Sequence, residues 1–269
     1  MKKTRELIAA NLKLVDMVIE VKDSRIPVSS RNPIIDDLVQ DKPRIIALNK
    51  SDLADSAETK KWLGKLSGAA FRAISLDSMH GKGIKELLSL LEKFESELNA
   101  GRIRKKNLRL MIVGIPNVGK SSLINRLTGK KSAKTGDKPG VTKGKQWLRL
   151  TNGMQLLDTP GILWPKFEDP EVGLKLAFCG SVKDEILDLE TLAFRLIKLL
   201  EKEYPNEFMK RYKLEELKEE TIDNMDAVAA KRGFILSGGR IDYARCARTV
   251  LDEFRAGTIG HITLEQIYD

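Results

Sequence analysis

The stretch "GIPNVGKSSLINRLTG" (114–129) has the spacing Gly-x-x-x-x-Gly-Lys-Ser. The apolar run "LRLMIVG" (108–114) before it predicts a buried strand, and "SSLINRL" predicts the helix that follows. The two glycines allow successive backbone N–H groups to face one point, where a helix N-terminus also favours an anion. We expect Lys120 to reach the β- and γ-phosphates of a nucleotide and the Ser121 hydroxyl to ligate Mg²⁺. The predicted nucleotide contacts of this loop are Asn117, Val118, Gly119, Lys120, Ser121 and Ser122.

A second motif, "DTPG" (158–161), follows the predicted strand "MQLLD". Asp158 is expected to hold Mg²⁺ through water, and the Gly161 N–H to meet the γ-phosphate. Between the two motifs lies "KPGVTKG", whose Thr142 is a candidate ligand of Mg²⁺ and of the γ-phosphate on a switch segment; a surface threonine is the alternative. The residues expected to act on the transferred phosphate are Lys120, Thr142 and Gly161.

The base is identified by "NKSD" (49–52), which follows the predicted buried strand "PRIIALNK". An aspartate can accept hydrogen bonds from both the N1–H and the 2-amino group of guanine. We therefore expect Asp52 to read guanine, Asn49 to contact the purine edge and Lys50 to pack along the loop. Ser51, within the same motif, is a further predicted nucleotide contact. An aspartate at this place favours GTP over ATP.

A further base contact is predicted after the strand "FRAIS", in "LDSMHGKGI" (76–84). Alignment on Gly81 and Gly83 places Asp77, Ser78 and Met79 where backbone N–H groups would contact the guanine O6. A register based on Ser75 is the alternative. The predicted nucleotide contacts in this segment are Asp77 and Ser78.

Short β-rich runs alternate with helical stretches as far as about residue 175, and only helical patterns follow. Such alternation predicts a mostly parallel sheet flanked by helices, here of six strands, with "KQWLRL" and "MQLLD" as an antiparallel hairpin. The guanine motifs precede the phosphate loop, whereas a GTPase domain usually begins with that loop. Because chain ends that lie close together can be joined and new ends opened in a loop, we predict a circularly permuted P-loop GTPase domain at 1–175 and a small all-helical domain at 176–269.

The charge is unevenly distributed. Of the 269 residues, 1–175 hold 33 Lys and Arg against 20 Asp and Glu, whereas 176–269 hold 14 against 18. The basic excess favours a polyanion such as RNA, and a solvated lysine-rich surface is the alternative. The two cysteines form no CxxC pair, and no apolar run is long enough to span a membrane, so we expect a cytoplasmic protein and, by default, a monomer.

One feature of many GTPases is missing. Ile162 follows Gly161, where signalling GTPases place a glutamine that orients the attacking water. An aliphatic side chain cannot do this, so we expect slow hydrolysis in isolation. Asn117 is similar to the asparagine by which potassium-stimulated GTPases hold a monovalent cation, which makes K⁺ a candidate cofactor; an asparagine that only shapes the loop is the alternative.

The permuted motifs "NKSD", "GIPNVGKSS", "KPGVTKG" and "DTPGILWPKFED", followed by "KRGFILSGG", resemble the YlqF/RbgA family of circularly permuted GTPases over nearly the whole chain. The resemblance implies a cytoplasmic GTPase that binds the precursor of the large (50S) ribosomal subunit and its rRNA late in assembly. It also implies a C-terminal helical domain of the kind found in RNA-binding antiterminators. Family members usually carry an aromatic-Pro-Gly-His stretch before the first helix, but this chain begins "MKKTRELIAANLKLVD". Either that segment is trimmed from this chain, or this member of the family uses other groups for catalysis.

Two hypotheses therefore remain open from the sequence. The first is a GTPase, with GTP or GDP and Mg²⁺ as ligands, that is activated by docking on the ribosomal precursor. The second is an RNA-binding scaffold whose nucleotide site is occupied but turns over feebly. A candidate RNA surface lies at 231–248, where five basic residues face one acid: Lys231, Arg232, Arg240, Arg245 and Arg248 against Asp242.

Overall fold

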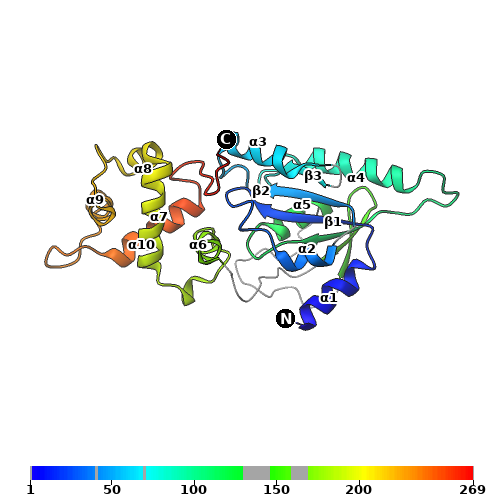
Figure 1. Ribbon diagram of the computed structural model, residues 1–269, viewed down its shortest axis with the longest axis horizontal. Coiled ribbons are helices and arrows are strands. Elements are labelled where there is room, and N and C mark those ends of the chain that lie inside the picture. The colour runs from blue at the N-terminus through cyan, green and yellow to red at the C-terminus, as the bar shows by residue number, and fades with distance from the viewer. Residues whose placement is uncertain (1, 40–41, 69–70, 130–145, 159–168, 269) are drawn as a thin grey trace.

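The computed structural model describes residues 2–39, 42–68, 71–129, 146–158 and 169–268 (Figure 1). Its strands are β1 (Met17–Asp23), β2 (Arg44–Asn49), β3 (Phe71–Ser75), β4 (Arg109–Val113), β5 (Gln146–Arg149) and β6 (Gln155–Asp158). Its helices are α1 (Lys2–Leu12), α2 (Pro33–Val39), α3 (Ser56–Leu66), α4 (Ile84–Leu98), α5 (Lys120–Thr128), α6 (Pro170–Phe178), α7 (Leu189–Glu203), α8 (Pro205–Tyr212), α9 (Thr221–Arg232) and α10 (Tyr243–Arg255), with a short 3-10 turn, η1 (Asp184–Ile186).

The strands form one six-stranded sheet in the order β3-β2-β1-β4-β6-β5. All neighbours are parallel except β5 and β6, which form the antiparallel hairpin that the sequence predicted. β1 lies between β2 and β4. Because the carboxyl ends of parallel strands meet at one edge, the segments after β2 and after β4 lie at the same edge with only β1 between them. The predicted mostly parallel sheet of a permuted P-loop domain is confirmed.

Both faces of the sheet are covered by helices. Every residue of β1, "MVIEVKD", is buried, as expected for a parallel strand packed on two sides. On one face, α1 and α2 pack through Ile8, Leu12, Ile35 and Val39 against Val18, Met111 and Val113. On the other face, α4 and α5 pack through Leu87, Leu91, Leu123 and Leu127. The odd and even positions of the central strands therefore belong to two different cores.

The helices after the sheet differ in part from the prediction. Only helical patterns were expected after residue 175, but residues 213–220 are not helical and α9 begins at Thr221. The physical reason is Asn224: its side chain accepts from the Lys218 N–H at 2.8 Å and donates to the Lys218 carbonyl at 2.9 Å, which takes both backbone groups away from a helix. Similarly, α7 begins at Leu189, capped by the Asp188 carboxylate.

The boundary predicted at residue 175 falls inside α6, and it stays a prediction. Buried apolar residues of α6, α7 and α10 belong to the same connected core as those of the sheet, so packing is continuous between the two parts. None of the helices of the described residues combines the length and the apolar character needed to cross a membrane.

The last segment, 256–268, returns to the α/β part (Figure 1). The Ile262 N–H donates to the Leu53 carbonyl at 3.0 Å, and Trp62 Nε1 donates to the Glu265 carbonyl at 2.7 Å. The Glu265 carboxylate accepts from the backbone N–H groups of Val28, at 2.6 Å, and Ser29, at 3.0 Å. The C-terminal segment therefore packs on both α3 and the loop that follows β1.

Candidate nucleotide-binding site

The loop between β4 and α5 has the geometry expected of a phosphate loop. Gly114 has a φ of 152°, and a Cβ there would lie 2.5 Å from the Val21 carbonyl oxygen. Gly119 caps α5 in a left-handed conformation that favours glycine. Lys120 is buried, and its Nζ donates to the Ile115 carbonyl of the same loop at 2.5 Å. The lysine ammonium is thus held over the concave side of the loop, next to the N-terminus of α5.

Asn49 connects the three motifs that the sequence separates. Its Nδ2 donates to the Val118 carbonyl of the phosphate loop at 2.8 Å. Its Oδ1 accepts from the Ser78 N–H at 3.0 Å and from the Ser78 Oγ at 2.8 Å. A Cβ on Gly119 would lie 2.2 Å from Asn49 Nδ2, so this close approach requires glycine. The contact with Ser78 favours the register based on residues 77–79 over the one based on Ser75.

Lys50 is placed by a buried ion pair. It has a φ of 60°, and its Nζ lies 3.1 Å from Asp23 Oδ2. The Asp23 carboxylate also accepts from Arg25 Nη2, at 2.9 Å, and Arg25 Nε, at 3.0 Å. Burial raises the pKa of Asp23, but the charges of Arg25 and Lys50 outweigh it and hold that pKa below its ordinary value. Asp23 is therefore an anion under the base-recognition loop.

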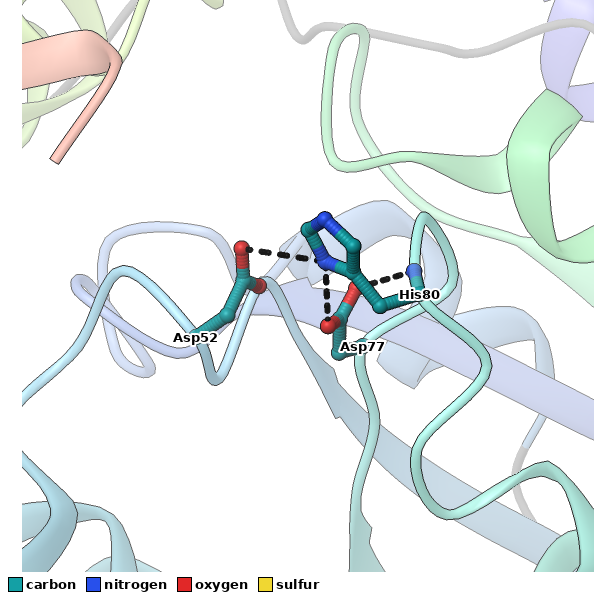
Figure 2. A group of neighbouring side chains, drawn as sticks. All are labelled: Asp52, Asp77 and His80. Carbon is teal, nitrogen blue, oxygen red and sulfur yellow. Dashed lines mark hydrogen bonds and ion pairs between the residues drawn. The ribbon is translucent and has the colours of Figure 1, made fainter.

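Asp52 lies beside a small polar cluster (Figure 2). The Asp77 Oδ1 accepts from the N–H groups of Met79 and His80, both at 2.9 Å, and its Oδ2 lies 2.7 Å from His80 Nδ1. The same ring nitrogen lies 3.9 Å from Asp52 Oδ2. The Asp77 side chain is only 5% exposed and is satisfied by this loop, whereas Asp52, at 29%, is open to a ligand.

The backbone N–H groups of the base segment are used within the protein. The Asp77 N–H donates to the Lys82 carbonyl at 3.0 Å, and the Ser78 N–H donates to Asn49. Both N–H groups therefore have partners within the protein, and the expected contact of Asp77 and Ser78 N–H groups with the guanine O6 stays a prediction. The loop is also fixed from behind by Arg126 of α5, which donates to the Ser78 carbonyl at 3.3 Å and to the Met79 carbonyl.

These residues surround a cavity of about 510 Å³. Of the described residues predicted to contact the nucleotide, two do not line it: Val118 has its side chain in the core, and Ser51 is held by its N–H to the Leu76 carbonyl at 3.0 Å. The lining residues that the sequence predicted are Asn49, Lys50, Asp52, Asp77, Ser78, Asn117, Gly119, Lys120, Ser121 and Ser122, with Met79 from the same base segment. Those that it missed are Arg25, Leu53, Cys179 and Arg255.

Arg25 and Leu53 follow the carboxyl ends of β1 and β2, the edge at which open α/β sheets bind ligands, so their position could have suggested them. Cys179 and Arg255 had no such signal, because they reach the cavity only through the packing of the helical part. Burial raises the pKa of the Cys179 thiol to about 12. The Cys179 thiol is therefore uncharged where it lines the cavity.

The predicted Mg²⁺ ligands are described only in part. Ser121 lies in the first turn of α5 and lines the cavity. Asp158 is the last residue of β6, which pairs in parallel with β4, so it ends at the same edge as the phosphate loop. Hydroxyl and carboxylate oxygens suit a hard cation such as Mg²⁺. Thr142 and Gly161 lie outside the described residues, as does Ile162.

Comparison with known proteins identifies the family. A family model described as RsgA GTPase matches residues 1–168, and one described as 50S ribosome-binding GTPase matches residues 109–230. The ribosome biogenesis GTPase A of Bacillus cereus is 46% identical over 98% of this chain and 91% of its own. The chain belongs to the YlqF/RbgA family of GTPases. The mouse mitochondrial ribosome-associated GTPase 1 is 35% identical over 96% of this chain and 85% of its own.

The solved YlqF structures have the same fold. The GDP-bound structure of TM YlqF superposes with a TM-score of 0.72 at 30% identity and covers 98% of this chain and 100% of its own. The GNP-bound YlqF from T. maritima gives 0.70 at 31% identity, with 98% of each chain covered. The names of these two structures describe them as GDP-bound and GNP-bound. As a member of this YlqF/RbgA family, the present chain is a GTPase with a circularly permuted domain.

Proposed function

We propose that this protein binds GTP and GDP with Mg²⁺ in the 510 Å³ cavity and hydrolyses GTP slowly on its own. It acts in the cytoplasm, as a monomer, in late assembly of the large (50S) ribosomal subunit, and docking on the subunit precursor and its rRNA accelerates hydrolysis. The names of the relatives support the ribosomal role, since they are ribosome biogenesis and mitochondrial ribosome-associated GTPases.

One observation carries the nucleotide part of the proposal. The Asn49 amide joins the Val118 carbonyl of the phosphate loop to Ser78 of the base segment, with donor–acceptor distances of 2.8 to 3.0 Å. Three motifs scattered over 70 residues are thereby arranged around one cavity. Two unrelated sites would not be expected to be joined by hydrogen bonds of a single side chain, that of Asn49.

Each residue then has a role set by its chemistry. Lys120 would leave the Ile115 carbonyl for the β- and γ-phosphates, where its charge would stabilise the charge that develops during transfer. Asp52 accepts from guanine, and Lys50 packs along the loop. Ser121, Asp158 and Thr142 would hold Mg²⁺, which would supply Lewis-acid chemistry to the phosphates. The Gly161 N–H would meet the γ-phosphate.

Monovalent-cation dependence is proposed at Asn117. It lines the cavity, has a φ of 60°, and uses its Nδ2 as a donor to the Gly180 carbonyl at 3.1 Å. The side-chain oxygen is the chemically suitable ligand for K⁺. Because Ile162 cannot orient water, a cation at this place or a group from the ribosome would have to complete the site.

The helical part from about residue 176 is proposed to contact rRNA. Of the five basic residues predicted at 231–248, Lys231, Arg240 and Arg248 are exposed and fit contacts with phosphate. Arg232 is paired with Glu253 at 2.7 Å, and Arg245 lies over the Phe234 ring at 4.7 Å, so these two are also structural.

The test is GTP hydrolysis with and without large ribosomal subunits, in K⁺ and in Na⁺. Lys120→Ala is the blank, and Lys85→Ala on the exposed side of α4 is the matched control. A large rise with subunits supports a ribosome-completed site, and a K⁺ requirement supports the cation at Asn117. GTP binding without any rise would overturn the switch and favour the RNA-binding scaffold.

A further inference from the structure

The outer rim of the nucleotide cavity is formed by the helical part. Asn117 of the phosphate loop donates its Nδ2 to the carbonyls of Gly180, at 3.1 Å, and Cys179, at 3.4 Å, in the turn that ends α6. Asn117 and Cys179 both line the cavity, and Arg255 lines it as well. A Cβ on Gly180 would lie 3.1 Å from Asn117 Nδ2, which shows how closely the Asn117 side chain approaches the backbone of this turn.

Arg255, the last residue of α10, holds that turn in place. Its Nε donates to the Phe178 carbonyl at 3.1 Å, and its Nη2 donates to the Ala177 carbonyl at 3.0 Å. The guanidinium also forms a two-pronged pair with Asp184, at 2.7 and 2.8 Å. The last carbonyls of α6 carry partial negative charge, so a cation is well placed there.

The end of α10 is in turn tied back to the α/β part. Arg25 Nη1 lies 3.5 Å from the carbonyls of both Phe254 and Arg255, and its guanidinium lies over the Phe254 ring at 5.2 Å. Arg25 is fully buried and pairs with Asp23, which pairs with Lys50. A continuous polar path therefore runs around the cavity from the phosphate loop, through the helical part, to the guanine-recognition motif.

We propose that Arg255 is a positioning residue of the nucleotide site. It acts through the turn at 177–181, which holds the Asn117 side chain. Guanine-nucleotide affinity is thereby linked to the docking of the helical part. The inference rests on the proposed function of the cavity. The phosphate loop carries a non-glycine residue with positive φ at Asn117, a conformation that needs support from its surroundings. By reciprocity, a partner that moves the helical part changes nucleotide affinity, and nucleotide changes the affinity for that partner.

The experiment is a double-mutant cycle on the full chain, with GDP affinity and GDP dissociation rate as readouts. Losing one hydrogen bond corresponds to about 1 kcal/mol, or about fivefold in affinity, so Arg255→Met and Asn117→Ala should each weaken GDP binding by about fivefold or more. The double variant should bind no more weakly than Asn117→Ala alone, because both changes break the same link. Arg255→Lys should restore part of the affinity. Arg195→Met, an exposed arginine of α7, should leave it unchanged.

A second variant covers the case in which Arg255→Met does not fold. Asp184→Asn removes only the negative charge that pairs with Arg255. The Asp184 side chain is 41% exposed, so the fold should tolerate the change. Asp184→Asn should weaken GDP binding less than Arg255→Met does. Its effect should likewise disappear when Asn117 is replaced by alanine. Additive losses in the cycle, or unchanged GDP binding in Arg255→Met, would overturn the inference. Absence of GDP binding by the unmodified chain would instead overturn the proposed function of the cavity.

Discussion

The two rims of the cavity are built in different ways. The base rim, made by Asn49, Ser78 and Arg126, is held by hydrogen bonds among segments of the α/β part. The outer rim, made by Asn117, the turn at 177–181 and Arg255, depends on the docking of the helical part. A rim built inside one packed unit changes only if that unit changes, whereas a rim built across two parts can open when one of them binds a partner. Selectivity for the base and sensitivity to the ribosome can thus lie on opposite sides of one site.

The largest expected effect is at Asp23, where the two rims meet. Asp23→Asn keeps the shape but leaves Arg25 fully buried without its counter-charge, which should lower the free energy of unfolding by about 3–5 kcal/mol at pH 7. The folded pKa of Asp23 lies below its ordinary value of 3.8. The contribution of the Asp23 charge to the free energy of unfolding is therefore complete above pH 3.8 and is lost as the pH falls from there toward the folded pKa.

The measurement for Asp23 is urea unfolding of the unmodified chain and the variant between pH 7 and pH 3. The difference should stay constant down to about pH 4 and shrink below it, from the ordinary aspartate pKa. Asp37→Asn, in an exposed pair with Arg5, is the control and should change stability little. A difference that grew toward acid pH would contradict the assignment of Asp23 as a buried anion.

The base rim is tested next at Asp52. Asparagine presents an N–H₂ group where aspartate presents a second acceptor. Asp52→Asn should therefore change the preferred nucleotide from GDP to xanthosine diphosphate (XDP). Two hydrogen bonds to a charged group make the change in relative affinity about a hundredfold or more. Competition binding of GDP, XDP and ADP measures it. An equal loss of GDP and XDP would mean that Asp52 supports the loop without reading the base.

A smaller effect is expected where the base rim meets the phosphate loop. Gly119→Ala places a Cβ 2.2 Å from Asn49 Nδ2 at a φ of +91°, so the bridge must open and GDP affinity should fall about tenfold, from strain of about 1–2 kcal/mol. Gly64→Ala in α3 meets no atom within 4 Å and should instead stabilise the helix by about 0.5–1 kcal/mol. Unchanged GDP affinity in Gly119→Ala would show that the Asn49 bridge is dispensable.

The same contrast explains what the sequence could and could not predict. The base rim and the phosphate loop were predicted because their chemistry lies in short motifs after buried strands, and the permuted order followed from those motifs. The outer rim was missed because Arg255 and Cys179 reach the cavity only through helix packing. The guanine O6 contact of Asp77 and Ser78 stays a prediction for a related reason: spacing locates a loop but does not say which N–H groups are already used inside it. The break before α9 was not expected from the helical patterns after residue 175, because propensity ignores the Asn224 side chain.

The smallest effect on nucleotide binding is expected at Glu265, where the C-terminal segment docks beside the cavity. Glu265→Gln replaces one acceptor oxygen with a donor facing the Val28 and Ser29 N–H groups and should lower stability by about 1–3 kcal/mol. GDP affinity should change less than about twofold, since Glu265 does not line the cavity and one hydrogen bond would correspond to about fivefold. Thermal unfolding and GDP titration on the same samples separate the two. A fall in the GDP affinity of Glu265→Gln as large as that in Gly119→Ala would contradict this expectation. The C-terminal segment would then belong to the base rim through the hydrogen bond between Ile262 and Leu53, and the division between the two rims would no longer hold.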